Sequence, residues 1–257
     1  MAIVLKKARE IELMRRASRI VALVWEAMAD MVVPGITTAQ LDEAAERIIH
    51  GHDAVPSFKG YPHRGANDFP ASICTSVNQE IVHGIPSSKR LLREGDIISI
   101  DVGAIYKGYQ GDGAITLPVG RVSEQAQQLI DVTKGALAAG ISRAKRGGRT
   151  SDISKAIEQY VHAHDFEVVR EYTGHGIGRE MHEDPQVTNY FNPRMQDYPL
   201  KPGMTIALEP MVSIGTWRTR VLADGWTVET ADGKLSAHFE HTIAITSDEA
   251  EILTRVD

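Results

Sequence analysis

The stretch Asp96-Ile-Ile-Ser-Ile-Asp-Val-Gly-Ala-Ile-Tyr-Lys-Gly-Tyr-Gln-Gly-Asp-Gly-Ala-Ile-Thr-Leu117 carries two apolar runs on either side of Lys107-Gly108. This pattern is typical of a β-hairpin with a two-residue turn. With such a turn, residue 114 lies opposite Asp101, and Asp112 is the diagonal neighbour of Asp101 on the same face. A bulge or a longer turn would instead bring the two aspartates directly opposite each other. In both cases the hairpin holds two carboxylates close together.

Helical and strand-like patterns surround this hairpin. Apolar residues recur at helical spacing over 9–33 and end at Pro34-Gly35. A capping box of Thr37 and Gln40 begins a second helix that reaches about His50. Residues 51–88 read as loop-rich. The remaining predictions are helices over 123–145 and 151–164 and strand-like segments over 167–172, 204–213, 225–230 and 235–246.

The two halves of the chain resemble each other. Residues 38–53 and 150–165 carry matching residue types 112 positions apart, and both end in His-x-His-Asp. Three more segments match in the same order: 82–85 with 174–177, 92–101 with 200–209, and 110–112 with 238–240. The shared order argues for duplication of a helix–helix–hairpin unit, with repeats at about 9–120 and 121–246 within a single domain, residues 1–257.

The matched pairs with chemical potential are carboxylates and histidines, namely Asp101 with Glu209, Asp112 with Glu240, and His83 with His175. A duplicated fold would gather the four acids, and like charges at close range force protonation or metal binding. Taken singly, an aspartate in a hairpin is more often solvent-facing, and Glu209 could be half of a buried salt bridge. Taken together, the matched positions favour a metal site. In the last strand, alternation places His238 and Glu240 on one polar face.

Composition excludes several classes of protein. The chain has 28 Lys and Arg against 34 Asp and Glu, a formal net charge of −6, which argues against a dedicated nucleic-acid binder. A single cysteine, Cys74, excludes a disulfide framework and a cysteine-based zinc finger. No apolar run is long enough for a signal peptide or a membrane span, so we expect a cytoplasmic protein without membrane or DNA partners. Two small basic clusters, 89–93 and 145–149, leave transient ribosome contact open, although solvated loop charge is the commoner reason for such clusters.

The chain resembles the type I methionine aminopeptidases over nearly its whole length. The motifs that carry the resemblance are Thr75-Ser-Val-Asn78, His83-Gly-Ile-Pro86, Gly95-Asp-Ile-Ile-Ser-Ile-Asp-Val-Gly103, Gly111-Asp112, Tyr172-Thr-Gly-His-Gly-Ile-Gly178, His182-Glu-Asp-Pro185, Lys201-Pro-Gly-Met-Thr205, Leu208-Glu-Pro-Met211, Asp224-Gly-Trp226 and Phe239-Glu-His-Thr242. The resemblance implies an α/β (α+β) pita-bread fold, in which two pseudo-symmetric halves place helices outside a curved, mostly antiparallel sheet. It also implies one catalytic domain and a monomer.

The resemblance further implies a dinuclear metal site and an activity. Two divalent ions would be bound by Asp101, Asp112, His175, Glu209 and Glu240. This ligand set tolerates Co²⁺, Mn²⁺, Fe²⁺ or Zn²⁺, so ligand type does not choose among them. The implied reaction is removal of the N-terminal methionine from nascent polypeptides whose second residue is small and uncharged, by attack of metal-activated water on the first peptide bond.

The resemblance assigns roles to further residues. Glu209 would also act as general base, and His83 and His182 would contact the scissile amide and stabilise the tetrahedral intermediate. The methionine pocket would be lined by Phe58, Tyr61, Phe69, Cys74, Met181 and Trp226. Aromatic residues in a long loop are about as often core residues as pocket walls, and no step of the implied mechanism needs Cys74 as a nucleophile.

The chain departs from the common family pattern at several positions. Gln110 replaces a frequent His, Gly103 a frequent Thr, and His238 a usual Gln; residues 62–68 look like an insertion beside the pocket. These departures affect metal preference and pocket shape but leave the implied ligands intact.

Two other functions remain as alternatives. An aminopeptidase P or prolidase-like peptidase of the same fold usually has a further N-terminal domain, whereas this chain begins almost directly with the first repeat. A non-catalytic binding protein would be expected to have lost metal ligands, and all five are present. The chain's own start, Met1-Ala2, fits the implied substrate rule and makes it a candidate for its own activity.

Overall fold

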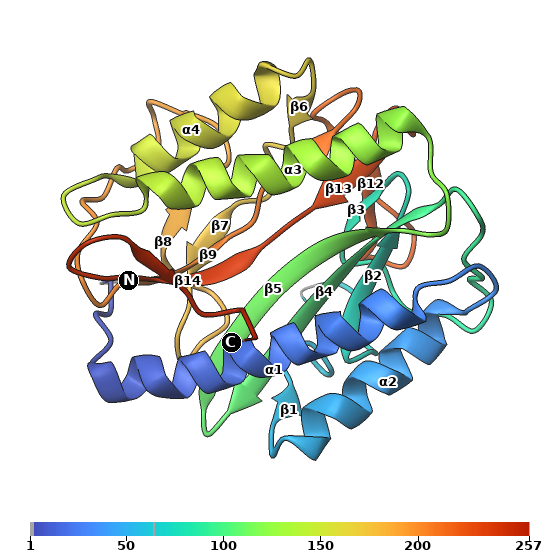
Figure 1. Ribbon diagram of the computed structural model, residues 1–257, viewed down its shortest axis with the longest axis horizontal. Coiled ribbons are helices and arrows are strands. Elements are labelled where there is room, and N and C mark those ends of the chain that lie inside the picture. The colour runs from blue at the N-terminus through green and yellow to red at the C-terminus, as the bar shows by residue number, and fades with distance from the viewer. Residues whose placement is uncertain (1–2, 64, 257) are drawn as a thin grey trace.

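The computed structural model describes residues 3–63 and 65–256, so Met1-Ala2 lies outside the described residues. Two pairs of helices cover one side of the molecule (Figure 1): α1 Ala8–Met31 with α2 Thr38–Gly51, and α3 Glu124–Arg143 with α4 Thr150–His162. These bounds agree with the predicted helices to within three residues. At α2, the Thr37 side chain accepts a hydrogen bond from the backbone of Gln40, and the Gln40 side chain accepts one from the backbone of Thr37, which confirms the predicted capping box.

The sheet lies against these helices, and its paired strands all run antiparallel within the described residues. The longest ladder is the hairpin of β4 Ile97–Tyr106 and β5 Tyr109–Pro118. Its two turn residues, Lys107 and Gly108, have φ values of 49° and 78°, as expected for a two-residue hairpin turn. Ala114 lies opposite Asp101, so the predicted register and the diagonal relation of the two aspartates are confirmed.

The remaining strands are short. They are β1 Val55–Pro56, β2 Ile73–Val77, β3 Glu80–Val82, β6 Glu167–Val168, β7 Gly174–Gly176, β8 Glu183–Val187, β9 Thr205–Leu208, β10 Met211–Ser213, β11 Thr219–Val221, β12 Val228–Thr230, β13 Ser236–His238, β14 His241–Ile245 and β15 Ala250–Ile252.

Several strand predictions need correction. The segments 167–172 and 225–230 form strands only at Glu167–Val168 and Val228–Thr230. The loop-rich interpretation of 51–88 is wrong for β2 and β3, because every residue of β2 is buried and the alternation that marks a strand is missing. The sequence also did not predict the strands β7, β8, β11 and β15; β7 consists of Gly-His-Gly, which has little strand propensity.

The predicted strands 204–213 and 235–246 are each interrupted, at Glu209-Pro210 and at Phe239-Glu240. They pair with each other on both sides of the interruption, as β9 with β14 and β10 with β13, in one continuous register that places Glu209 opposite Glu240. In the second half these two segments are thus the arms of one ladder, and β11 and β12 lie between them along the chain. At the break, the Glu240 backbone bonds to Ala114 of β5 instead, which joins the two halves of the sheet.

The helix pairs dock on the sheet through equivalent contacts. In the first half the Gly35 amide donates to Leu92 O at 2.8 Å, and in the second half the Gly147 amide donates to Leu200 O at 3.3 Å. Asp53 and Asp165, which follow α2 and α4, both have φ near 60°. The segments that match in sequence thus have matching backbone geometry.

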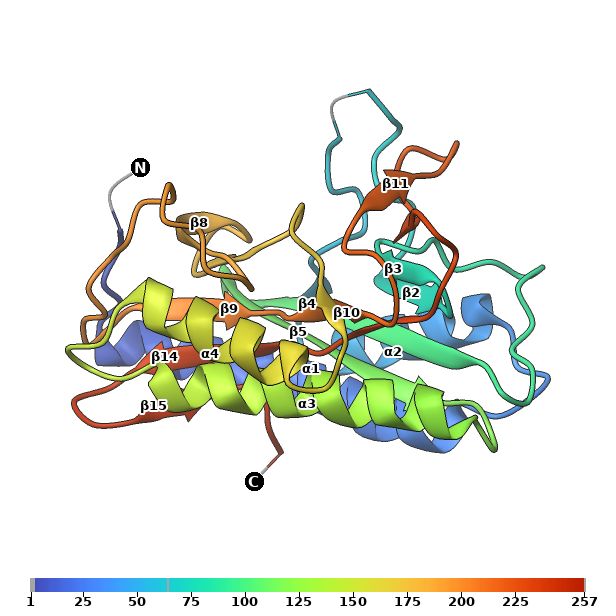
Figure 2. The ribbon, with the colours of Figure 1, turned by 90° about the horizontal axis from the view of Figure 1, so that it is seen from above.

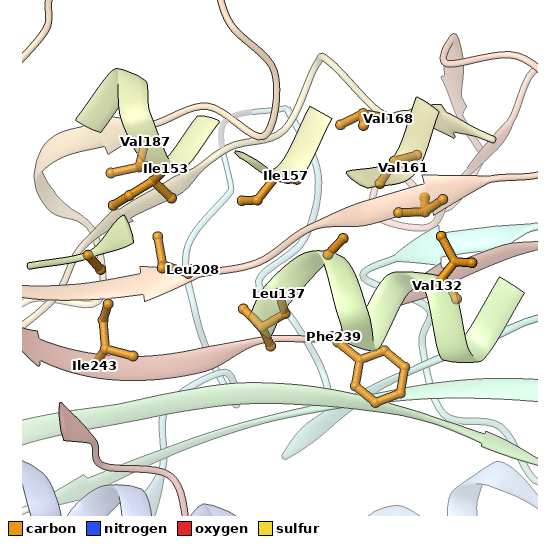
Figure 3. Packing of buried hydrophobic residues seen from close by; sticks show 14 of the residues in the cluster. Val132, Leu137, Ile153, Ile157, Val161, Val168, Val187, Leu208, Phe239 and Ile243 are labelled. Carbon is orange, nitrogen blue, oxygen red and sulfur yellow. The ribbon is translucent and has the colours of Figure 1, made fainter. Parts of the chain in front are cut away.

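Each helix pair buries an apolar face against the sheet. Figure 3 shows buried side chains of α3 (Val132 and Leu137), α4 (Ile157) and the strands (Leu208 and Ile243), which belong to one apolar cluster. Burial of one such side chain contributes about 1.5–3 kcal/mol. Helices α1 and α3 cover one side of the sheet (Figure 2). The segments that carry β8 and β11 lie on the other side, and the site described below opens there.

Candidate metal centre

A row of residues crosses the middle of the sheet and carries three carboxylates. Cys74 of β2 pairs with Asp101, Asp101 pairs with Ala114, and the Glu240 amide donates to Ala114 O at 2.8 Å. Glu209 lies opposite Glu240 at the break in the next strand. Asp112, two residues before Ala114 on β5, adds the fourth carboxylate on the same face.

His175 of β7 completes this cluster. Its Nδ1 lies 2.9 Å from Gly176 O, and a carbonyl can only accept, so Nδ1 carries the ring proton. Nε2 is then unprotonated, and it lies 3.4 Å from Glu209 Oε1 and 3.8 Å from Asp112 Oδ2. One ligand atom each of Asp112, His175 and Glu240 lies within 4.8 Å of the others. A lone pair that faces carboxylates is the arrangement of a metal-ligating histidine.

The electrostatics of the cluster favour a cation. Burial and the neighbouring acids raise the pKa of Asp101, Glu209 and Glu240 well above the usual range, and burial raises the pKa of Asp112 to about 7. Burial lowers the pKa of His175 to about 3, so the imidazole is neutral. Asp101 Oδ1, Asp112 Oδ1 and Glu240 Oε1 are buried without a hydrogen-bond partner among the described residues. Such orphaned oxygens fit divalent metal ions, which would compensate them.

We expect the carboxylate cluster to make the metal-free protein less stable as the pH rises from about 4 to about 7. An acid whose pKa is raised by folding holds a proton that the unfolded chain has already released, so its contribution to stability is lost as the pH rises through the folded value. For Asp112 the pKa in the folded protein is about 7, and the pKa of each of the other three acids is raised as well. The unfolding temperature of the chelator-treated parent chain should therefore fall relative to that of chelator-treated Asp112→Asn between about pH 4.5 and about pH 7, because the buried histidines, whose lowered pKa values act in the opposite sense, are common to both proteins.

A comparison with added metal accompanies this measurement. Added Mn²⁺ should remove the decline, because a bound cation compensates the ionised carboxylates. A metal-free parent chain whose unfolding temperature does not fall relative to Asp112→Asn over this range would show that the pKa of Asp112 is not raised in the folded state.

His83 and His182 both line the pocket that contains the cluster. His83 has φ 60°, a strained conformation for a non-glycine residue, and its ring contacts Tyr172 and Trp226 at centroid distances of 5.8 and 6.1 Å. Burial lowers its pKa to about 4. The exposed ring of His182 lies 4.4 Å from that of His175, and the surrounding protein atoms lower its pKa as well. Both imidazoles are therefore neutral near pH 7.

A pocket of about 250 Å³ lies over the carboxylates. Its wall contains all six residues predicted to form the methionine pocket: Phe58, Tyr61, Phe69, Cys74, Met181 and Trp226. The Phe69 ring packs edge-on against the rings of Phe58 and Trp226, with centroid distances of 6.5 and 5.1 Å. Burial raises the pKa of the Cys74 thiol well above its usual value, which agrees with the prediction that it is not a nucleophile.

Sequence reasoning missed two residues of the pocket wall, Pro62 and His63. They belong to the segment 62–68, of which residue 64 is not described. The His63 ring lies 4.7 Å from Trp226, and Trp226 Nε1 donates to Asn67 O at 2.8 Å. The position of His63 in an apparent insertion was the only signal in the sequence, and it did not indicate the direction of the side chain.

The departures from the common family pattern have local structural correlates. Gly103 has no room for a Cβ, which would lie 2.7 Å from Ser57 Cβ. The Ser57 hydroxyl donates in turn to Gln110 Oε1 at 2.7 Å, so residues 57, 103 and 110 form one packed unit beside Asp112. His238 is buried, its Nε2 lies 3.8 Å from Glu240 Oε2, and neither ring nitrogen has a hydrogen-bond partner among the described residues.

Comparison with known proteins agrees with this geometry. Residues 12–247 match the family model described as metallopeptidase family M24. The chain is 53% identical over 254 residues to methionine aminopeptidase 1 of Bacillus subtilis (99% of this chain, 100% of the relative), and 50% identical to a methionine aminopeptidase of Clostridium acetobutylicum, with 98% of each chain covered.

Solved structures give the same result. The structure of methionine aminopeptidase from Thermotoga maritima matches with a TM-score of 0.95 at 44% identity and covers 99% of this chain and 100% of its own. The prolidase from Pyrococcus furiosus matches with a TM-score of 0.78 at 22% identity, and 66% of its chain is covered. The second match shows a shared fold alone.

Proposed function

The chain belongs to metallopeptidase family M24, and from the site we propose that it is a methionine aminopeptidase with the pita-bread fold. The observation that carries this proposal is the convergence of four carboxylates and one unprotonated imidazole nitrogen beneath a small, mostly aromatic pocket. A site of this kind can bind divalent metal and hold an apolar side chain next to it. It therefore suits hydrolysis of the peptide bond that follows an N-terminal methionine.

We propose that Asp101, Asp112, His175, Glu209 and Glu240 hold two divalent ions per chain, of Co²⁺, Mn²⁺, Fe²⁺ or Zn²⁺. The orphaned oxygens of three of these carboxylates support this assignment. Divalent ions supply a lowered pKa for water and polarisation of the scissile carbonyl.

The protein's own groups would do the rest. Glu209 lies at the cluster, opposite Glu240, so its carboxylate would be in place to accept a proton from water. His83 and His182, both neutral and both in the pocket wall, would bind the scissile amide and the oxygen that gains charge. The wall from Phe58 to Trp226 would hold the methionine side chain, whose flexible thioether packs well against aromatic rings.

We further infer that residues 1–257 form one catalytic domain with repeats at about 9–120 and 121–246, that the protein is a cytoplasmic monomer, and that its substrates are the N-termini of nascent polypeptides. Among residues 3–63 and 65–256, no helix combines the length and the apolar character that crossing a bilayer requires. Transient ribosome contact would use the positively charged side chains of the basic clusters 89–93 and 145–149, to which Arg90 and Arg149 belong. Arg90 and Arg149 are already paired with Glu80 and Asp197.

Hydrolysis of peptides Met-X tests the proposal. The residue after the scissile bond must pass between the carboxylates and His83. Because all of these groups line one pocket of about 250 Å³, little room remains for a large side chain. We expect Met-Ala, Met-Gly and Met-Ser peptides to be cut well and Met-Leu and Met-Arg peptides poorly. Because the preference comes from steric clash, it should exceed the roughly 10–200-fold that a lost methylene contact gives. The measurement is kcat/KM across the panel with metal-loaded protein.

Leu-Ala and Ala-Ala peptides serve as controls for the first residue. Equal rates for every X, or faster release of leucine than of methionine, would point to a general aminopeptidase. Cleavage restricted to Met-Pro would favour the aminopeptidase P alternative, whose fold the chain shares. A protein that binds no metal and cuts none of the peptides would be the non-catalytic alternative.

A further inference from the structure

Tyr61 has a contact that a pocket wall does not need. Its hydroxyl lies 2.8 Å from Nδ1 of His182, within hydrogen-bond distance. The two rings also meet edge-on, with centroids 5.8 Å apart and an interplanar angle of 74°. Tyr61 therefore lines the pocket and also contacts one of the two proposed catalytic histidines.

The position of Tyr61 is fixed by its own backbone. Its amide donates to Phe58 O at 2.8 Å, and its carbonyl accepts from the Phe69 amide at 3.0 Å. The Gly60 amide donates to Phe69 O at 2.8 Å, so the base of the 62–68 segment is closed. The backbone that carries the hydroxyl thus belongs to a short, hydrogen-bonded turn.

The partners of the two adjacent imidazoles differ in kind. His175 Nδ1 faces the Gly176 carbonyl, which can only accept, so its proton is on Nδ1 and Nε2 is free to act as an acceptor. His182 Nδ1 faces a phenol hydroxyl, which can donate. Burial raises the pKa of Tyr61, so this hydroxyl keeps its proton near pH 7.

We propose that Tyr61 is a positioning residue that donates to His182 Nδ1 and so holds the imidazole as the Nε2–H tautomer, with its donor available to the substrate. The rings of His175 and His182, whose centroids are 4.4 Å apart, then have opposite roles. Nε2 of His175 is an acceptor that faces the carboxylate cluster, whereas Nε2–H of His182 donates to the substrate oxygen that gains charge. The catalytic part of this proposal rests on the proposed function; the tautomer does not.

The kinetic test is Tyr61→Phe in the metal-loaded enzyme with a Met-Ala peptide. Phenylalanine keeps the ring that lines the pocket and removes only the hydroxyl. We expect kcat to fall about tenfold, the size of one lost hydrogen bond, while KM stays within about twofold. Phe58→Leu is the matched control, because it changes the wall without touching His182; it should raise KM more than it lowers kcat.

A double-mutant comparison and a spectroscopic measurement separate positioning from structure. In a His182→Ala background, Tyr61→Phe should have no further effect on kcat. In ¹⁵N-histidine-labelled protein, the ring nitrogens of His182 should show the Nε2–H tautomer in the parent chain, and Tyr61→Phe should populate both tautomers. Bound metal, measured in parallel, should be unchanged in the variant.

An Nδ1–H tautomer for His182 in the parent chain, or an unchanged kcat in Tyr61→Phe, would overturn the proposal. The spectrum needs no turnover, so it still decides the tautomer if the parent protein fails to cut Met-Ala peptides. That failure would count against the proposed function and leave the tautomer measurement to stand by itself.

Discussion

Glu240→Gln should abolish tight metal binding and, with it, hydrolysis. The side chain is buried, and its backbone amide and carbonyl both bond to Ala114, so the substitution changes the charge without moving the residue. Removal of an outer-shell partner of a metal typically costs 10–100-fold in affinity, and loss of a ligand should cost more than about 100-fold. Asp101→Asn, on the same row of the sheet, should behave alike.

The stability of these variants should depend on metal in a characteristic way. With metal present, Glu240→Gln should unfold at a lower temperature than the parent chain, because the binding energy no longer stabilises the folded state. Without metal it should be at least as stable as the parent, since one of four mutually repelling acids is gone. Calorimetric titration with Mn²⁺ and thermal unfolding with and without chelator would measure both effects.

Asp42→Asn is the control for a half-buried, hydrogen-bonded acid outside the cluster. Asp42 accepts hydrogen bonds from the amides of Ser72 and Ile73, so this substitution should lower stability equally with and without metal and leave metal affinity unchanged. If Glu240→Gln or Asp101→Asn bound two ions as tightly as the parent chain, its assignment as a ligand would be wrong.

His83→Ala should keep its metal and lose roughly two or more decades in kcat, the usual scale for removal of an acid–base or oxyanion partner. His83 lines the pocket, and its ring is held between Tyr172 and Trp226. It is not part of the Asp112, His175 and Glu240 cluster. Single-turnover rates with a Met-Ala peptide and metal analysis of the same sample would measure the two properties together.

The backbone of His83 calls for a second variant. Its φ of 60° is better tolerated by asparagine than by alanine, so His83→Asn separates loss of the imidazole from backbone strain. Both variants should lose similar activity. Loss of metal in either would identify His83 as a further ligand, and an unchanged kcat would show that its role is structural.

Local sequence patterns determined the helices and the central hairpin. The four helices follow from apolar spacing and from caps such as that of Thr37, both of which act over a few residues. The register of Asp101 with Ala114 follows from the two-residue turn at Lys107-Gly108, because turn length fixes the pairing of a hairpin. The duplicated segments then indicated that the acids of the two halves belong together.

The tertiary structure alone decided how the site is closed. The strands β2 and β7 are stabilised by their neighbours, β4 for β2 and both β8 and β9 for β7, and their own sequences lack a strand pattern. The breaks at Glu209 and Glu240 arise because the Glu240 backbone pairs with Ala114, which is far away in the sequence. Likewise, the bond from Tyr61 to His182 spans 121 positions. Contacts of this range depend on how the two halves pack, and no periodicity or turn rule within a short window encodes them.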